Sequence, residues 1–106
     1  MSRLMNGGWS VQPPEIPAGG SREETVSYHE YSRSAAFSCG VLEDGTMTIF
    51  FGNSAQWERD YPWFAIRRDE IIGRVVESLL EPGWIAEISD VTGCTVAHIH
   101  RQAPEV

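Results

Sequence analysis

The sequence contains few cysteines, few basic residues and no long apolar run, and each shortage excludes a class of protein. Only Cys39 and Cys94 are present among the 106 residues, too few for a disulfide framework, so we expect reduced, partly buried thiols. No apolar run approaches the roughly 18 to 20 residues of a membrane-spanning helix. The N-terminus lacks the basic and apolar regions of a secretory signal. The sequence therefore predicts a cytoplasmic protein with no membrane partner.

Basic residues are outnumbered by acidic ones, which bears on the choice of partner. Lysine and arginine together number 8 against 15 aspartates and glutamates, giving a formal net charge of -7. A nucleic-acid partner would require clustered positive charge to displace counterions from phosphates, so DNA and RNA binding are excluded. The length is sufficient for one hydrophobic core but not for two.

Motifs that define a reaction are also missing. Gly52-Asn53-Ser54 follows an apolar run, but it forms neither a phosphate-binding glycine loop nor a G-x-S-x-G elbow. Glu87 and Asp90 are three residues apart in a predicted strand, so they face opposite sides and cannot act as a carboxylate pair. We therefore expect no cofactor and see no general acid and base.

Residues 1–23 are predicted to form a flexible N-terminal arm, and residues 24–106 a single α+β domain. The arm is rich in glycine and proline and has few apolar anchors. Trp9 is the exception. An indole in such a segment packs either on its own domain or on a neighbouring subunit, and we favour its own domain.

Five segments show the alternation or the β-branched and aromatic content of strands. The Asp44-Gly45 pair is a strong hairpin signal between the second and third segments. Pairing there would place six apolar residues on one face, where the helix should pack: Phe37, Cys39, Val41, Met47, Ile49 and Phe51. The predicted strands are 25–31, 35–42, 46–51, 84–91 and 94–100.

One amphipathic helix is predicted between the third and fourth strands. The helix is expected to start near Arg68 or Asp69, with Asp69 as the candidate N-cap. Glu70 and Arg74 form an i,i+4 pair, and Pro82-Gly83 follow its end. Gly73 interrupts the helix, and we expect a close packing contact there. The apolar stripe comprises Ile71, Ile72, Val75, Val76, Leu79 and Leu80.

This order, β-β-β-α-β-β, defines an α+β fold with a mostly antiparallel sheet of about five strands, covered on one face by the single amphipathic helix. The apolar stripe is wider than the roughly 100° needed to cover one sheet. The sheet would also leave one face and an edge strand uncovered. These features predict a homodimer.

An aromatic loop at residues 56–64 is the first candidate site. Trp57, Arg59, Tyr61 and Trp63 are candidate contacts to a protein or small ligand, since Trp and Tyr are enriched in binding hot spots. The alternative is structural: Trp63 and Phe64 would anchor the loop in the core, while Trp57 would lie on the surface.

A cluster near the C-terminus is the second candidate. The two-residue period of a strand places Cys94, His98 and His100 on one face, and thiolate and imidazole are ligands for zinc. His98 and His100 are the candidate metal ligands. A complete site would need a third ligand, with His29 or Glu30 as candidates. The alternative is a strand whose histidines are solvated or hydrogen-bonded.

Two functions follow. The first is a small acidic, non-enzymatic binding protein whose aromatic loop holds a protein or small ligand, similar in size and layout to toxin-neutralising proteins and to accessory products of mobile elements. The second is a small metal-binding protein or enzyme that uses His98 or His100 in a pocket. We favour the first, with zinc belonging only to the second.

Overall fold

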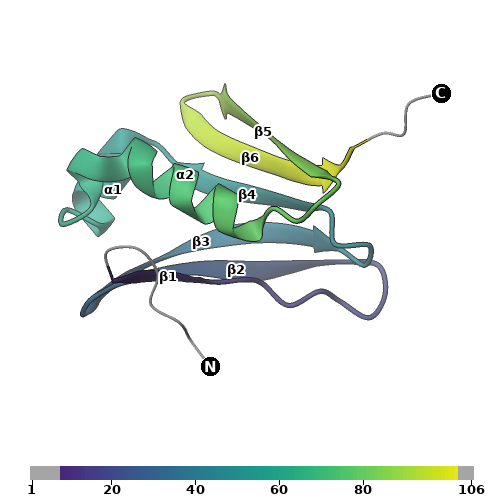
Figure 1. Cartoon of the computed structure of the whole chain (residues 1–106). Helices are drawn as coiled ribbons and strands as arrows, with labels where there is room; N and C mark the ends of the chain where they lie inside the picture. The colour runs from purple at the N-terminus through teal and green to yellow at the C-terminus, as the bar shows by residue number, and fades with distance from the viewer. Residues whose placement is uncertain (1–7, 103–106) are drawn as a thin grey trace.

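The computed structural model describes residues 8–102 and contains a six-stranded antiparallel sheet with its helices between the fourth and fifth strands (Figure 1). The strand order is β1-β2-β3-β4-β6-β5. The α+β class is confirmed, with six strands in place of the expected five. The elements are β1 (Trp9–Gln12), β2 (Ser21–Glu30), β3 (Arg33–Leu42), β4 (Met47–Gly52), α1 (Ser54–Asp60), a 3-10 turn (Ala65–Arg67), α2 (Arg68–Leu79), β5 (Trp84–Val91) and β6 (Cys94–Arg101).

The additional strand, β1, comes from the segment predicted to be an arm. It pairs antiparallel with β2, with Trp9 opposite Glu30. Trp9 is buried, and its ring lies 6.1 Å from that of Tyr28, so its predicted packing on its own domain is confirmed. Ser21 already begins β2. Residues 1–7 of the predicted arm lie outside the described residues.

The β3–β4 hairpin forms at the predicted position. Asp44 accepts a hydrogen bond from the backbone N–H of Thr46 at 2.9 Å, and Gly45 has a φ of 94° that favours glycine. The six apolar residues expected on one face are all buried there. The Asp-Gly turn and the alternation of β3 therefore determine the register of the central strands.

Helix α2 carries the predicted apolar stripe, with Ile71, Ile72, Val75 and Val76 buried. It begins at Arg68, as predicted, but its N-cap and its last residue differ from the prediction. The N-cap is Arg67, not Asp69, because a 3-10 turn leads directly into the helix. The backbone N–H of Arg68 donates to the carbonyl of Ala65 in that turn, and no side chain caps the helix. The helix ends at Leu79, since Leu80 is already extended. The predicted Glu70–Arg74 pair is present at 2.8 Å.

A second short helix, α1, lies within the predicted aromatic loop. Asn53 caps it by accepting a hydrogen bond from the backbone N–H of Gln56, whose side chain accepts one from the backbone N–H of Asn53. This reciprocal pair is a capping box. The Asn-x-x-Gln spacing at residues 53–56 was the available sequence signal for this helix.

Gly73 does not mark a close contact, contrary to the prediction. A Cβ built there meets no atom within 4 Å, and the backbone is helical. We therefore expect Gly73→Ala to raise the free energy of unfolding by about 0.4–1 kcal/mol, because alanine restricts the unfolded chain and suits a helix. Chemical denaturation followed by circular dichroism measures this.

Gly45→Ala is the matched control for that substitution. Its Cβ would lie 3.2 Å from the Trp84 ring at a positive φ, so we expect a loss of stability there. Destabilisation by Gly73→Ala of the same size as by Gly45→Ala would contradict the open environment of Gly73.

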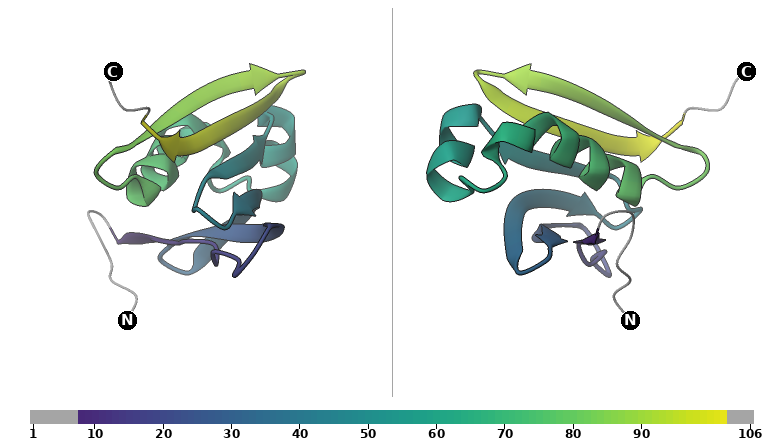
Figure 2. Two further views of the ribbon diagram at one scale, coloured as in Figure 1. Left: turned by 90° about the vertical axis from the view of Figure 1, so that its right-hand side faces the viewer. Right: turned by 60° about the vertical axis from the view of Figure 1, so that its left-hand side comes forward.

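The helices leave one face of the sheet uncovered within residues 8–102. Figure 2 shows α2 lying across one side of a strongly twisted sheet, with the β5–β6 hairpin projecting beyond it. We call the opposite side the open face. The longest described helix, α2, has 12 residues, and none of the described helices has the length and apolar content of a membrane span.

Candidate functional site

The aromatic loop folds with Trp57 inside the protein. Trp57 is 1% exposed, stacks on Phe37 at 5.4 Å and donates its indole N–H to the carbonyl of Phe51 at 2.7 Å. The structure therefore contradicts the expected surface position of Trp57. Helix α1 causes the reversal, because it turns this side chain toward β3 and β4.

Tyr61 and Trp63 occupy the rim of the same loop. The Tyr61 hydroxyl donates to the carbonyl of Ala36 at 2.8 Å and accepts from its N–H at 3.3 Å, which fastens the loop to β3. Trp63 is 38% exposed, and the Arg33 guanidinium lies 4.9 Å from its ring centre. Arg59 is exposed and pairs with Asp60. Of the four predicted residues, Trp63 and Arg59 remain on the surface.

A hollow of about 570 Å³ lies on the open face. Strand alternation places small side chains of β3 at its floor, and Phe50 of β4 lies directly opposite Ser38. Phe50 and Leu42 are 47% and 44% exposed although each belongs to an inner strand. The lining residues are Ser21, Arg22, Glu23, Ser38, Gly40, Val41, Leu42, Thr46, Thr48, Phe50 and His98.

The charge around this hollow is acidic. Glu23 lines it, and Arg22, the one arginine in the lining, pairs with Glu24 at 3.0 Å. In the strand register Glu87 of β5 lies opposite His98 and shares the open face. Apolar side chains bordered by carboxylates suit a ligand surface that is partly apolar and basic.

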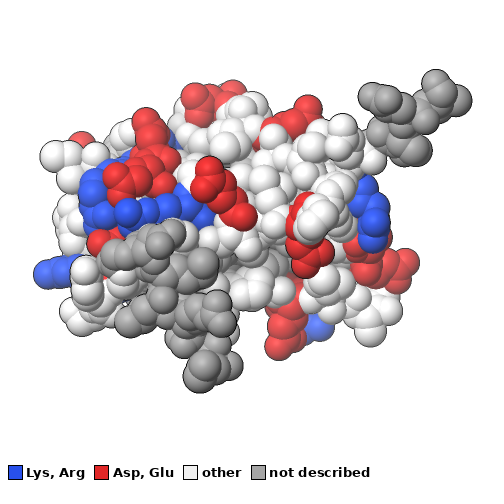
Figure 3. All heavy atoms as spheres, in the orientation of Figure 1, with Lys and Arg blue, Asp and Glu red and all other residues white. Residues whose placement is uncertain are grey.

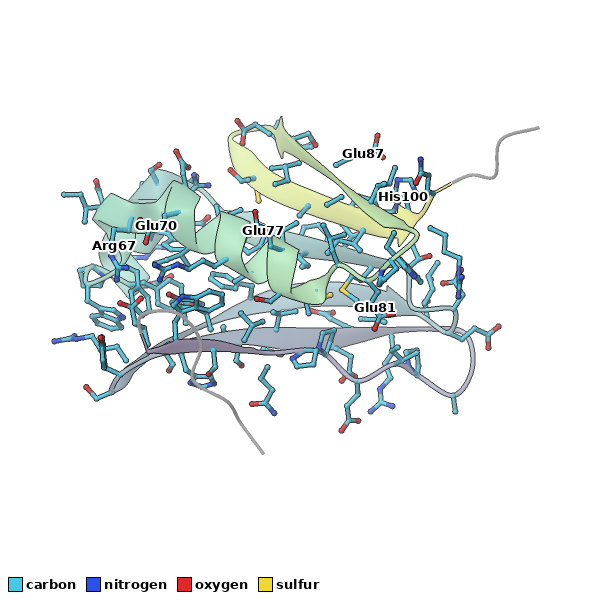
Figure 4. All side chains as sticks on the ribbon, in the orientation of Figure 1. Arg67, Glu70, Glu77, Glu81, Glu87 and His100 are labelled. Atoms are coloured by element: carbon cyan, nitrogen blue, oxygen red, sulfur yellow. The ribbon has the colours of Figure 1, made fainter. Side chains whose placement is uncertain are left out.

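The predicted histidine cluster lies on the open face. His98 Nδ1 is hydrogen-bonded to Thr48 Oγ1 at 3.0 Å, and His100 Nε2 lies 2.9 Å from a carboxylate oxygen of Glu87. Figure 4 shows His100 and Glu87 side by side on the β5–β6 hairpin. The hydrogen bond to Glu87 is the main cause that raises the pKa of His100. The two imidazole rings are 4.9 Å apart.

The structure does not bring the expected third metal ligand to these histidines. His29 lies opposite Ser34 of β3. His98 lies opposite Thr48, which in turn lies opposite Gly40 of β3. Ser34 and Gly40 are six residues apart along β3, so the two histidines are separated by roughly 20 Å. Glu30 points to the side of α2. Between residues 8 and 102, no group of three metal-ligating side chains converges.

Thr48 and Cys39 carry the candidate nucleophiles of the central strands. The Thr48 hydroxyl and His98 imidazole have nucleophile–base spacing, but the nearby carboxylate of Glu87 binds His100, not His98. Burial raises the pKa of the Cys39 thiol to about 11, so it stays protonated and unreactive. Neither the Thr48 hydroxyl nor the Cys39 thiol is therefore an activated nucleophile.

Charged residues on the side of α2 form hydrogen bonds and ion pairs that connect the sheet to the helices. Glu30 accepts hydrogen bonds from Arg67 at 3.0 Å and from the Tyr28 hydroxyl at 2.6 Å, and Arg74 lies 3.3 Å away. Figure 3 shows arginine and acidic side chains interspersed at the N-terminal end of α2, and Figure 4 shows Arg67 beside Glu70. Because opposite charges are paired there, this region presents no uncompensated basic patch.

Comparison with protein-family models, curated proteins and solved structures gives no match for this chain. Sequence reasoning identified the two histidines and the uncovered face, but not the hollow. The sequence did contain a signal for the floor of the hollow. From Ser34 to Gly40, every second residue of β3 is small and alternates with a buried residue; these small residues are Ser34, Ala36, Ser38 and Gly40. The hollow itself depends on which strands flank β3.

Proposed function

We propose that this chain is a non-enzymatic binding protein that acts as a homodimer and captures a basic protein partner on its open face. The observation that carries the proposal is the hollow, whose lining exposes Phe50 and Leu42 and includes the carboxylate of Glu23. Free thiols at Cys39 and Cys94 fit the reducing cytoplasm that the sequence predicts. Toxin-neutralising proteins and accessory products of mobile elements belong to this class of binding protein.

Shape and charge both support a protein partner. The small side chains of β3 leave room for an apolar side chain of the partner beside the exposed ring of Phe50. Apolar side chains buried in this way contribute most of the binding energy of many interfaces. A net charge of -7 increases the association rate with a basic surface at low salt. In the aromatic loop, Trp63 and Arg59 are available for additional contact, since Trp57 and Tyr61 are held in the fold.

A second candidate is metal binding by His98 and His100, favoured by the 4.9 Å separation of their rings. Two imidazoles alone form an incomplete zinc site. A native mass spectrum with stoichiometric zinc, lost in His98→Ala, would support this candidate. Under the binding-protein proposal the spectrum contains no stoichiometric metal.

A photo-crosslinking amino acid placed at Ser38 tests the main proposal in cells of the organism that encodes the chain. We expect a discrete crosslinked product with a basic protein, reduced at least about tenfold by Phe50→Arg, which removes the apolar anchor and repels positive charge. Mass spectrometry identifies the product, and in extracts of the same cells its yield should fall as salt rises.

Two controls make the result specific. The same crosslinker at Glu77, on the exposed side of α2, should not give this product. Ile66→Arg, at a side chain that is 93% exposed elsewhere, should leave the Ser38 product intact. Equal capture from both crosslinker positions, or capture insensitive to Phe50→Arg, would exclude the open face as the binding surface.

A further inference from the structure

The two edges of the sheet differ in how well they are protected. One edge is β1, which has only four residues and is followed by Pro13 and Pro14. Short strands and prolines at an edge prevent pairing with another chain. The other edge is β5, which has eight residues, no proline and no described element pairing with its outer side (Figure 1). Only β5 is therefore suited to pair with a further strand.

Strand β5 exposes apolar side chains on both of its faces. Ile85 and Val91 lie on the open face and are 36% and 55% exposed. Ile88 lies on the side of α2 but beyond the cover of that helix, and it is 52% exposed. An edge strand with exposed apolar residues on both faces gains burial on each side when a partner strand pairs with it.

The acidic residues of β5 are already satisfied within the chain. Glu87 is hydrogen-bonded to His100 at 2.9 Å, and Asp90 accepts a hydrogen bond from the Thr95 hydroxyl at 2.7 Å. These contacts hold both carboxylates toward β6. A partner strand therefore does not need positive charge to compensate them, and a second copy of β5, which carries the same two carboxylates, can pair with the first.

Symmetry restricts how two copies of β5 can pair. A two-fold axis perpendicular to the sheet makes the strands antiparallel and places one residue of β5 opposite its own copy. With Ile88 on the axis, Ile88 meets Ile88 on the side of α2, and Ile85 meets Val91 on the open face. The remaining pairs are Glu87 with Ser89 and Ala86 with Asp90, so no carboxylate faces another.

Neighbouring registers lose this complementarity. An axis through Glu87 or Asp90 places identical carboxylates directly opposite one another, which is destabilising. An axis through Ser89 opposes Glu87 to Val91 and Ile88 to Asp90, so Val91 and Ile88 each meet a charge. Of the axis positions from 87 to 90, Ile88 is the one that pairs apolar with apolar residues and opposes no two carboxylates.

We propose that β5 pairs antiparallel with β5 of a second copy, with the two-fold axis at Ile88. This specifies the homodimer of the proposed function and is independent of what binds the open face. Two sheets of six strands then form one continuous sheet, and both hollows lie on the same side of it.

Cysteine crosslinking of the purified chain tests the register. Ile88→Cys in a Cys94→Ser background should form an intermolecular disulfide under mild oxidation, because residues on the axis have Cα atoms about 4.5–5.5 Å apart, within disulfide range. Ser89→Cys in the same background is the matched control. Its copies would be separated by roughly 8 Å, beyond that range. Efficient crosslinking by Ser89→Cys but not by Ile88→Cys would overturn the register.

Sedimentation of the otherwise unmodified chain tests the interface itself. We expect a dimer whose dissociation constant rises at least about tenfold in Ile88→Lys, which replaces an apolar pair with opposed like charges. Ile66→Lys makes the same change at an exposed isoleucine away from β5 and should have no such effect. A monomer at all concentrations, or a dimer equally stable in Ile88→Lys, would overturn the proposal. Neither result would exclude capture of a partner on the open face.

Discussion

Replacing Trp57 by alanine is expected to lower the free energy of unfolding by about 3–5 kcal/mol. The indole is buried between the sheet and the aromatic loop, where it stacks on Phe37 and packs edge-on against Tyr61 at 5.8 Å. Its removal leaves a cavity and deprives the buried carbonyl of Phe51 of its side-chain donor. Urea denaturation followed by circular dichroism measures the loss.

Two variants separate the causes of that loss. Trp57→Phe keeps an aromatic ring and removes the N–H donor, so it should cost less than Trp57→Ala. Trp63→Ala removes an indole that is 38% exposed, and we expect a change below about 1 kcal/mol. If Trp63→Ala proved as destabilising as Trp57→Ala, the placement of the two indoles would be incorrect.

The second large effect is expected at Glu30, which holds Arg67 and Arg74 of the helical layer against β2. We expect Glu30→Gln to cost about 2 kcal/mol at neutral pH, less than the ~3–5 kcal/mol of a fully buried pair, because both arginines are partly exposed. The substitution preserves the shape of the side chain but leaves both guanidinium groups without their shared anion. Glu77→Gln, at an exposed position on α2, is the control and should have little effect.

The lowered pKa of Glu30 determines how its contribution to stability changes with pH. Burial alone would raise the pKa of Glu30, but hydrogen bonds from Tyr28 and Arg67 and the nearby arginine charges outweigh it and lower the pKa below 4.5. Burial raises the pKa of Tyr28 to about 12, so its hydroxyl remains a donor throughout this range. A lowered carboxyl pKa stabilises the fold above pH 4.5, and that contribution disappears as pH falls through the folded-state value.

The stability difference between the wild-type chain and Glu30→Gln should therefore be constant above pH 4.5 and should shrink on acidification. Denaturation series across this range measure it, with Glu77→Gln as reference. A difference that grew toward low pH would contradict the assigned role of Glu30, since protonation would then strengthen the wild-type contact.

Local patterns were sufficient for much of the fold. The 3.6-residue period of Ile71, Ile72, Val75 and Val76 predicts α2 because these residues share one helical face, and the structure buries all four. The Asp44-Gly45 turn predicts the β3–β4 hairpin for an equally local reason. The sequence analysis did not predict α1. This helix has seven residues and its main sequence signal is its cap, and the four aromatic residues of the segment favoured a binding loop instead.

The candidate site was predictable only in part. Strand alternation placed His98 and His100 on one face, but the exclusion of His29 depends on three successive strand pairings. The positions of Trp57 and Trp63 were reversed because composition does not show which way a helix turns its side chains. The pairing of Glu30 with Arg67 and Arg74 joins residues about forty positions apart in sequence.

The sequence by itself determined the α+β class, the central hairpin, the apolar face of α2 and the acidic charge, because each depends on residues within a few positions of one another. The tertiary structure alone decided that β1 joins the sheet, that Trp57 is buried, that Phe50 lines a hollow and that β5 is an edge strand of the described sheet. These features depend on strand order and on which side the helices cover. Both are set by packing between distant segments, for which local periodicity carries no information.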